Sequence, residues 1–313
     1  MNDKKIAVLI PAYNEEKTIA SVMLDFHKAC PQAKQFIVDN NSTDQTKSII
    51  FEIIDKHGIS AEYIFEGKQG KGAAVRTGFR SIESDIIVLV DADCTYQASD
   101  LTMMLSLFEE SNADMLVGDR LSNGKYREQN KRLFHNFGND LVRNIINYQY
   151  KSKINDVMTG YRIISSKFKN HYSVIYDGFQ LETDMTIHAL DKNLRIVEVP
   201  IQYLDRPDGS VSKLSTYRDG FKVILTIFNL FRYYKPMIFF TSISLMLLLF
   251  SLTAGILPVK DYIDSGYVYH LPLAILASSL CVLAILTAIA GIILDAIARN
   301  NKIAFDRSWS GKH

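Results

Sequence analysis

Two long uncharged runs near the carboxyl end place the strongest constraint on how this 313-residue chain can fold. Neither Pro236–Val259 nor Ser265–Leu294 contains an Asp, Glu, Lys or Arg residue. A helix needs about 20 predominantly apolar residues to cross a hydrocarbon layer about 30 Å thick, and both runs are longer than that. We therefore expect two membrane spans, at about 237–257 and 271–294. The alternative, a pair of buried helices in a soluble protein, fits the length of the runs less well.

The charges beside these runs predict their orientation. Basic residues cluster before the first run and after the second: Arg232, Lys235, Arg299, Lys302, Arg307 and Lys312. The intervening loop has only Lys260, offset by Asp261 and Asp264. The positive-inside rule then predicts a hairpin over 236–297 in the cytoplasmic membrane, with both termini, including the tail 298–313, and the long charged part of the chain before the hairpin in the cytosol.

Composition excludes several other classes of protein. The chain has 35 basic and 34 acidic residues, which fits neither a nucleic-acid-binding tail nor a disordered acidic segment. The apolar stretch at the amino terminus is too short for a signal peptide. Cys30, Cys94 and Cys281 are scattered, so neither a disulfide framework nor a zinc site is expected.

The first part of the chain alternates short apolar runs with longer amphipathic ones, the pattern of strands joined by crossover helices. The expected strands are Ile6–Ile10, Gln35–Asp39, Tyr63–Phe65, Asp85–Asp91 and Met115–Gly118. The expected helices are Glu15–Ala29, Asp44–His57, Lys71–Ile82 and Asp100–Glu110. Uniformly apolar strands are covered on both faces, so the sequence predicts an α/β fold with a parallel sheet flanked by helices. Ligands bind at the carboxyl ends of such strands.

Beyond Gly118 the pattern is weaker. Helices are expected over Lys131–Tyr150 and Leu181–Asn193, a strand over Arg195–Tyr203, and a loop over 204–217. The cytosolic domain should therefore span 1–217. The segment 218–235 is apolar but contains basic and aromatic residues, which favours an amphipathic helix in the membrane surface over an ordinary core helix.

The expected fourth strand ends in Asp91-Ala92-Asp93. Residues at i and i+2 of an extended chain point the same way, so these two carboxylates can share one divalent cation. Oxygen ligands favour Mg²⁺ or Mn²⁺, and such a cation would neutralise a diphosphate.

Polar residues also follow the other strands. Asp39 is placed to accept hydrogen bonds from a nucleobase. Ser42, Thr43 and Asp44 have another explanation besides ligand binding, because all three residue types commonly cap the amino terminus of a helix. The first strand runs into a turn that presents Tyr13 and Glu15, although Pro11 and Asn14 fit a plain turn as well.

Gly67–Arg76 opens a helix with glycines and basic residues, where backbone amides and Lys71 would attract phosphate. Its spacing matches neither a Walker loop nor a dinucleotide fingerprint.

Taken together, these motifs resemble glycosyltransferase family 2. IPAYNEE, VDNNSTDQT, QGKGAAVRTG and DAD occur in the family's order and spacing, and DVMTGYR and RPDGSVSKL resemble its polyprenyl-phosphate mannose or glucose synthase branch. The resemblance covers about residues 5–235. It implies the GT-A fold, a nucleotide-sugar donor and inverting transfer to a lipid-linked phosphate.

The resemblance also implies roles for single residues. The nucleotide would be bound by Pro11, Tyr13, Glu15, Asp39, Lys71, Asp91, Ala92 and Asp93, with the metal on Asp91 and Asp93. The acceptor phosphate would be bound by Arg120, Arg132, Asn136, Arg206, Ser212 and Lys213. The catalytic set would be Asp91, Asp93, Lys71, Arg120 and Arg132. Asp156 and Arg162 would form a hydrogen-bonded pair that shapes the pocket, while Glu182 and Asp184 are better explained as charges at a helix amino terminus.

Three positions depart from the family pattern. Thr95 stands where mannose synthases often have a metal-binding glutamine, Cys94 replaces the usual glycine, and Asn40 replaces the second Asp of V-D-D-G. The two carboxylates of the D-x-D sequence are retained.

The predicted function is therefore metal-dependent, inverting transfer of a sugar from a nucleotide sugar to a membrane polyprenyl phosphate. Phosphate is already anionic near neutral pH, so no strong general base is needed. A hydroxyl acceptor in polysaccharide or cell-envelope glycan synthesis is the enzymatic alternative, and would make Asp156, Glu182 or Asp184 the candidate base. A non-catalytic nucleotide-binding membrane scaffold is the alternative of another class. UDP-glucose, UDP-N-acetylglucosamine and GDP-mannose stay open as donors, with a UDP-sugar slightly preferred, and a homo-oligomer is neither required nor excluded.

Overall fold

The structure is a computed structural model that describes residues 4–122, 133–178, 180–207, 228–229 and 231–310, with the backbone alone for 133–138. The chain divides into two compact units, Met1–Val223 and Ile224–His313.

The first unit is built on a seven-stranded sheet, counted over the described residues, with strand order β3-β2-β1-β4-β6-β5-β7. Its strands are β1 Ile6–Ala12, β2 Lys34–Asp39, β3 Ala61–Phe65, β4 Ile86–Leu89, β5 Met115–Asp119, β6 Arg162–Ser165 and β7 Ile196–Pro200. All neighbouring pairs are parallel except those of β6, which runs antiparallel to both β4 and β5. The mostly parallel α/β sheet expected from the sequence is thus confirmed, with β6 as an added antiparallel strand.

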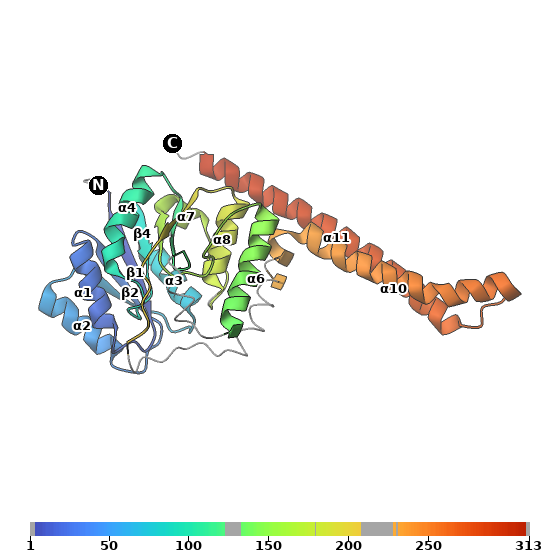
Figure 1. Ribbon diagram of the computed structural model, residues 1–313, viewed down its shortest axis with the longest axis horizontal. Helices are drawn as coiled ribbons and strands as arrows, with labels where there is room; N and C mark the ends of the chain where they lie inside the picture. Colours follow the sequence, from blue (N-terminus) through green and yellow to red (C-terminus); the bar gives the residue numbers. More distant parts are fainter. Residues whose placement is uncertain (1–3, 123–132, 179, 208–227, 230, 311–313) are drawn as a thin grey trace. The chain divides into compact units, whose positions relative to one another are not determined.

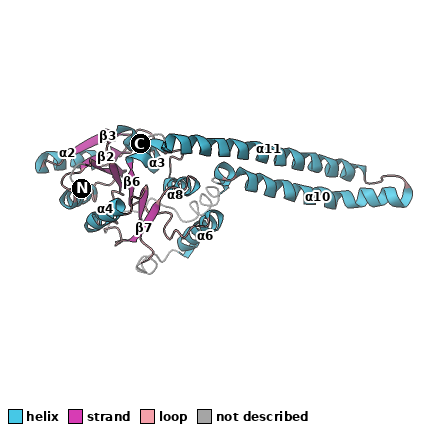
Figure 2. Ribbon diagram, turned by 90° about the horizontal axis from the view of Figure 1, so that it is seen from above, coloured by secondary structure: helices cyan, strands magenta, loops and turns pink. Residues whose placement is uncertain are grey.

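Helices cover both faces of this sheet. They are α1 Ile19–Ala29, α2 Thr46–His57, α3 Lys71–Ser81, a short 3₁₀ turn Ala98–Asp100, α4 Leu101–Glu110, α6 Leu133–Tyr150, α7 Ser166–His171 and α8 Leu181–Asp191. Figure 1 shows α1, α2 and α4 on one side of the sheet and α3 and α8 on the other, and Figure 2 shows the strands in magenta between them.

Successive apolar side chains of β1 point to opposite faces of the sheet, so helices have to cover both faces. Ile6, Val8 and Ile10 belong to the core cluster beneath α1, α2 and α4. Leu9 points the other way, against α3, where Gly78 has no space for a side chain because a Cβ would lie 2.4 Å from a Leu9 methyl carbon. Because both faces of the strand are covered, its sequence is apolar without interruption.

The strands and helices expected up to Gly118 occur with small changes at their ends, the largest being that the first helix begins at Ile19 instead of Glu15. Two elements were not expected, β6 and α7. β6 begins with Arg162, whose side chain is fully buried, so the strand has no apolar start to identify it.

The second unit contains α10, Pro236–Ser265, and α11, Leu271–Ser310, which run side by side (Figures 1 and 2). Both are long and apolar enough to cross a membrane. Only 6% and 11% of their most apolar windows are buried, whereas the core helix of a soluble protein is mostly buried. Before them, residues 228–229 and 231–234 are helical, and the rest of the expected interface helix lies outside the described residues.

Hydroxyl groups and small residues join these two helices. Ser251 Oγ donates to the Ala277 carbonyl and Ser244 Oγ to the Ala284 carbonyl, both at 2.7 Å. Gly291 packs directly on Phe240, where a Cβ would lie 2.8 Å from the Phe240 Cβ. In lipid, such close approach and internally satisfied polar groups are what hold helices together.

Candidate active site

The sheet reverses its strand order between β1 and β4, because β2 and β3 lie beyond one edge of β1 and the later strands beyond β4. Parallel α/β sheets bind ligands at such a reversal, outside the carboxyl ends of the strands. Here β1 leads into Tyr13 and Glu15, and β4 leads into Asp91 and Asp93. The residues expected from the sequence to bind a nucleotide therefore surround this point.

Lys71, the first residue of α3, lies between two carboxylates. Its Nζ forms ion pairs with Asp91 Oδ1 and, at 2.5 Å, with Glu182 Oε1. The Lys71 side chain is only 10% exposed and that of Glu182 only 4%. Burial alone would lower the pKa of Lys71, but Asp91 and Glu182 outweigh it and raise the pKa above its ordinary value. Lys71 therefore stays positively charged at physiological pH, next to the carboxylate that follows β4.

Asp93 also forms an ion pair with a basic side chain, that of Arg206. Arg206 Nη2 lies 2.6 Å from Asp93 Oδ2, and its Nη1 lies 3.7 Å from Glu15 Oε1. Thr95 Oγ1 donates to Asp93 Oδ1 at 2.5 Å. Thr95 occupies the position where mannose synthases often have a metal-binding glutamine. Here its hydroxyl orients the second carboxylate of the D-x-D sequence.

Cys94, between Asp93 and Thr95, adopts φ +61°. That left-handed conformation favours glycine, which explains why glycine is usual at this position in the family that the sequence resembles. Burial, and then the charge of Asp93, raise the pKa of the Cys94 thiol to about 11, so the thiol is neutral at physiological pH.

Asp39 lies at the end of β2 and is held by two donors. Its Oδ1 accepts from the Ser42 amide at 2.9 Å and its Oδ2 from the Tyr63 hydroxyl at 2.8 Å. Burial, followed by the neighbouring Asp39, raises the pKa of Tyr63. Asp44 accepts from the amide of Thr46, the first residue of α2, at 3.0 Å, but the N-cap of this helix is Gln45, which makes no side-chain cap hydrogen bond.

Asn40, where the resembled family has Asp, ties β2 to the glycine-rich loop. Its Nδ2 donates to the Lys68 carbonyl at 2.7 Å, and its Oδ1 accepts from the Gly70 amide at 2.6 Å. A carboxylate could not make the first of these bonds.

Asp177 holds the same loop from the opposite side. Its carbonyl accepts from the Gly72 amide at 2.8 Å, and its carboxylate pairs with Lys68 and Arg76. A Cβ at Gly70 or Gly72 would overlap this backbone, so both glycines are required by the close approach.

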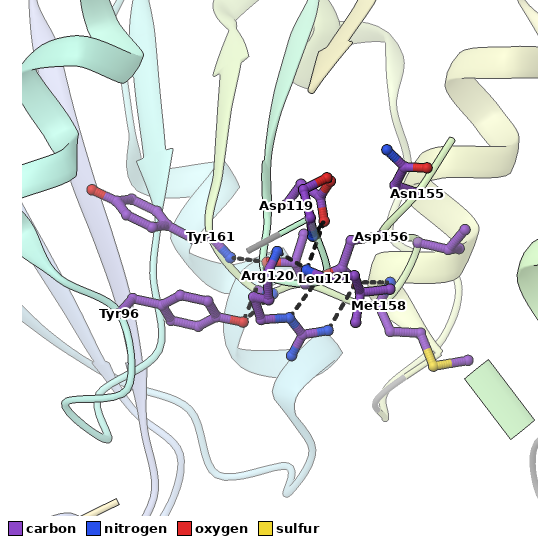
Figure 3. Close-up of polar contacts among 12 residues, drawn as sticks. Tyr96, Asp119, Arg120, Leu121, Asn155, Asp156, Met158 and Tyr161 are labelled. Carbon is purple, nitrogen blue, oxygen red and sulfur yellow. Dashed lines mark hydrogen bonds and ion pairs between the residues drawn. The ribbon is translucent and has the colours of Figure 1, made fainter. Parts of the chain in front are cut away.

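Arg120, which follows β5, and Asp156 form a buried pair (Figure 3). Arg120 Nε and Nη2 donate to the two Asp156 oxygens at 2.7 and 2.9 Å. Burial raises the pKa of Asp156, but Arg120 outweighs it, so the net direction is downward. The Arg120 guanidinium also lies over the Tyr203 ring, 5.4 Å from its centroid.

The expected pairing of Asp156 with Arg162 is wrong. Arg162 instead donates to the carbonyls of Thr159 and Val157 and to the Thr186 hydroxyl, at 2.7–3.0 Å. The partner of Asp156 is Arg120. The backbone amide of Arg120 also donates to Asp156 Oδ2, at 3.2 Å, and adds to the two bonds from its side chain.

Glu198 of β7, which was not singled out from the sequence, supports this pair. Its carboxylate accepts from the backbone amides of Asn155 and Asp156 at 2.8–3.0 Å. Burial raises the pKa of Glu198. Glu182 and Asp184 lie in the first turn of α8 as expected, but both are buried and bonded, Glu182 to Lys71 and Asp184 to the Tyr172 hydroxyl.

The remaining expected residues are distributed unevenly. Pro11 and Tyr13 are half-buried and Ala92 is buried, all three at the strand ends. Arg132, Ser212 and Lys213 lie outside the described residues, as does the side chain of Asn136.

A divalent cation fits the donor chemistry at the end of β4. Asp91 and Asp93 supply only carboxylate oxygens, the ligands that Mg²⁺ and Mn²⁺ prefer. Space beside Asp91 is kept by Gly160, since a Cβ there would lie 2.5 Å from Asp91 Oδ2.

Comparison with known proteins agrees with this geometry. Glucosyl-3-phosphoglycerate synthase from Mycobacterium tuberculosis, solved in complex with Mn²⁺, UDP and glucosyl-3-phosphoglycerate, is similar with a TM-score of 0.56, at 17% identity over 73% of this chain and 80% of that one. The fold is thus of the GT-A type.

Two curated proteins of Haloferax volcanii are similar over most of their length. Glycosyltransferase AglJ is 28% identical over 76% of this chain and 76% of its own. A dolichyl-phosphate hexose transferase is 27% identical over 69% of this chain and 89% of its own. The polyprenol monophosphomannose synthase of Mycolicibacterium smegmatis is 27% identical over 68% and 82%.

The profile of the family described as Glycosyl transferase family 2 matches residues 7–171, which contain β1 to β6 together with Asp39, Lys71, Asp91 and Asp93. That match covers more than half of the chain, and it includes the strand ends at which the charged residues gather. The chain therefore belongs to glycosyl transferase family 2.

Proposed function

We propose that this glycosyltransferase moves a hexose from a nucleotide sugar to a membrane polyprenyl phosphate, with inversion at the anomeric carbon and with the help of a divalent cation. The observation that carries the proposal is that Asp91 and Asp93, each paired with a basic group, occur in a chain that also has two helices fit to cross a membrane. Such a chain can bring a charged diphosphate and a lipid phosphate to one surface.

The relatives support the lipid phosphate as acceptor. Those named dolichyl-phosphate hexose transferase and polyprenol monophosphomannose synthase match the greater part of this chain. The solved relative that binds Mn²⁺ together with UDP supports a divalent cation and a nucleotide donor. Mg²⁺ and Mn²⁺ are both suitable, and UDP-sugars and GDP-mannose both stay candidates for the donor.

The proposed reaction is a direct displacement. An oxygen of the acceptor phosphate forms a bond to the anomeric carbon while the bond from that carbon to the donor diphosphate breaks, and the nucleoside diphosphate leaves with the electron pair. Arg120 and Arg132 are proposed to orient the attacking phosphate, which turns an encounter at a membrane into an oriented attack.

Charge on the leaving diphosphate is the main obstacle to this step. Lys71, held at the amino terminus of α3, is proposed to neutralise it together with the amides of the glycine-rich loop. Asp91 and Asp93 would hold the cation, which when bound supplies further positive charge to the leaving group. Asp39, Tyr13, Glu15 and Pro11 are proposed to bind the nucleoside.

A phosphate acceptor also suits the carboxylates of this pocket better than a hydroxyl acceptor does. A hydroxyl would need a base, and the three candidates are already bonded: Asp156 to Arg120, Glu182 to Lys71 and Asp184 to Tyr172. A phosphate needs none, because it is anionic near neutral pH.

We further propose the arrangement of the chain at the membrane. The glycosyltransferase domain, 1–217, would lie in the cytosol, 218–235 would form an interface helix, 236–297 the membrane hairpin and 298–313 a cytosolic tail. The excess of basic residues on that side of the spans supports this orientation. Ser212 and Lys213, with Arg206, are proposed to close over the site.

Transfer by the full-length protein in lipid nanodiscs tests the proposal. Radiolabelled UDP-glucose, UDP-N-acetylglucosamine and GDP-mannose are each supplied with polyprenyl phosphate and either Mg²⁺ or Mn²⁺, and label is counted in the lipid extract. We expect one donor to label the lipid, and chelation of the cation to stop it.

Asp91→Asn is expected to reduce that labelling by at least a hundredfold without loss of the folded protein. Asp55→Asn, the same change at an exposed position of α2, is the matched control and should label normally. Undiminished transfer by Asp91→Asn contradicts the metal assignment, and labelling of a hydroxyl acceptor in place of the lipid phosphate contradicts the proposed acceptor.

A further inference from the structure

Two basic side chains lie directly on the carboxylates that are proposed to hold the cation. Lys71 is shared between Asp91 and Glu182, and Arg206 between Asp93 and Glu15. Each basic group therefore joins one carboxylate of the D-x-D sequence to a glutamate from another part of the chain. We call these six residues the charge cluster.

The charge cluster is negative overall, because four carboxylates face two cations, a formal charge of −2. That charge matches one divalent cation. The cation, however, has to reach oxygens that already contact Lys71 and Arg206, and the positive charges would repel it.

A diphosphate meets the opposite difficulty at the same place. Lys71 and Arg206 would attract it, but they are bonded to Asp91 and Asp93, whose negative charges would repel it. Separating Lys71 from Asp91 is costly in particular, since Lys71 is nearly buried and would lose one of its two carboxylate partners.

Both difficulties disappear if the two ligands arrive together. The diphosphate then takes Lys71 and Arg206 as partners while the cation takes Asp91 and Asp93, so no charge is left unpaired. Glu182 and Glu15 keep the two basic side chains close during the exchange.

We propose that Lys71 and Arg206 are exchangeable counter-ions, which give up Asp91 and Asp93 to the cation when a nucleotide diphosphate binds. This inference rests on the proposed function, because it assumes a diphosphate donor. It assigns the two basic residues a second role, that of excluding a cation that arrives without nucleotide.

The experiment measures binding in place of transfer. Full-length protein in nanodiscs of uncharged lipid is titrated with Mn²⁺, and free Mn²⁺ is followed by electron paramagnetic resonance, with no nucleotide, with UDP and with GDP. In the unaltered protein we expect weak Mn²⁺ binding alone and at least tenfold tighter binding with one of the nucleotides. By reciprocity, Mn²⁺ should tighten nucleotide binding by the same factor.

Tighter Mn²⁺ binding in the presence of nucleotide does not by itself show that Lys71 and Arg206 are counter-ions. A cation that contacts the diphosphate directly would produce the same coupling. The decisive variant is Lys71→Met, which should bind Mn²⁺ about tenfold more tightly without nucleotide and yet bind the nucleotide more weakly. These opposite changes are not expected from general damage to the fold. Lys34→Met, which removes an exposed lysine paired with Glu62, is the matched control and should change neither affinity.

Arg206→Gln keeps the test decisive if Lys71→Met does not fold, because Arg206 is the more exposed of the two basic residues. It should change both affinities in the same directions. Unchanged or weaker Mn²⁺ binding by the folded variants in the absence of nucleotide overturns the inference while the proposed function stands. Failure of both UDP and GDP to bind the unaltered protein with Mn²⁺ overturns the proposed function as well.

Discussion

Gly160 lies so close to Asp91 that a Cβ on it would be 2.5 Å from the Asp91 Oδ2 and 2.9 Å from its carboxyl carbon. Gly160 belongs to the loop that leads into β6, whereas Asp91 follows β4, and these two strands are antiparallel neighbours. The sheet thus holds a glycine against the first carboxylate of the D-x-D sequence.

Gly160→Ala should therefore displace the Asp91 carboxylate and reduce both transfer and cation-dependent nucleotide binding by at least tenfold. Calorimetric titration of UDP and GDP with Mn²⁺ measures the binding. Gly255→Ala is the matched control, because its new Cβ would lie 3.8 Å from Ala277, an ordinary contact. Normal nucleotide binding by Gly160→Ala would show that the position of Asp91 is not critical.

Asn40→Asp should weaken nucleotide binding, although Asp is the residue of the resembled family at this position. The change removes the donor that bonds the Lys68 carbonyl and so loosens the glycine-rich loop. We expect a five- to tenfold rise in the Kd of UDP or GDP, measured by the same titration. Asn41→Asp adds the same charge one residue further on, and an equal loss there would attribute the effect to charge alone.

Glu198→Gln tests the support of the Arg120–Asp156 pair. Oε1 of Glu198 accepts from the backbone amides of both Asn155 and Asp156, but glutamine removes the charge and replaces Oε2, which accepts from the Asn155 amide at 2.8 Å, with an amino group that cannot accept. A lost hydrogen bond to a charged group costs about 1.5–3 kcal/mol. We expect a lower thermal midpoint and a severalfold higher KM for polyprenyl phosphate, with the donor KM unchanged. Glu62→Gln, at a β3 residue whose side chain is 43% exposed, is the control. Equal increases in both KM values would indicate general damage instead.

His188 should make the stability of the protein depend on pH. It packs in the interior against Phe168 and Tyr172, and burial lowers its pKa from 6.5 to about 4. Between these two values the unfolded chain binds a proton that the folded chain does not, so stability rises with pH from about 4 and is fully present above 6.5. The shift corresponds to a difference on the order of 3 kcal/mol.

Thermal unfolding between pH 4.5 and 7.5 measures this dependence. His188→Gln should show a flatter dependence of the midpoint on pH than the unaltered protein. His57→Gln, at an exposed position of α2, should leave the slope unchanged. Parallel slopes for the unaltered protein and His188→Gln would exclude His188 as the titrating group.

Much of the fold could be predicted because β1 and β4 are apolar throughout and polar residues follow them, while β2 is apolar over Phe36–Val38 and then ends at Asp39. Position after such a strand was enough to identify Asp39, Asp91 and Asp93. β6 could not be found in this way, because it begins with Arg162, a residue type that is normally exposed, and the Thr186 hydroxyl that helps to bind its buried side chain lies 24 residues further along the chain.

The pairing of charges was the less predictable part of the site. Lys71 could be recognised at the start of a helix, but nothing near it in sequence indicates that Glu182 of α8 lies 2.5 Å away. The choice of Arg120 over Arg162 as the partner of Asp156 likewise depends on the register of β5 and β6, which no local pattern reveals. Glu198 had no signal, since it alternates with apolar residues as any exposed strand residue does.

The length of α11 affects how deeply the protein would insert in the proposed membrane arrangement. At about 1.5 Å per residue its 40 residues extend roughly 60 Å, twice the depth of a hydrocarbon layer of about 30 Å. The final turns, which carry Arg299, Lys302 and Arg307, must then emerge into the headgroups and water as rigid helix. In the proposed membrane arrangement, the helix would not move deeper without burying those three cations in hydrocarbon, so its charged end would fix the depth of the enzyme in the membrane.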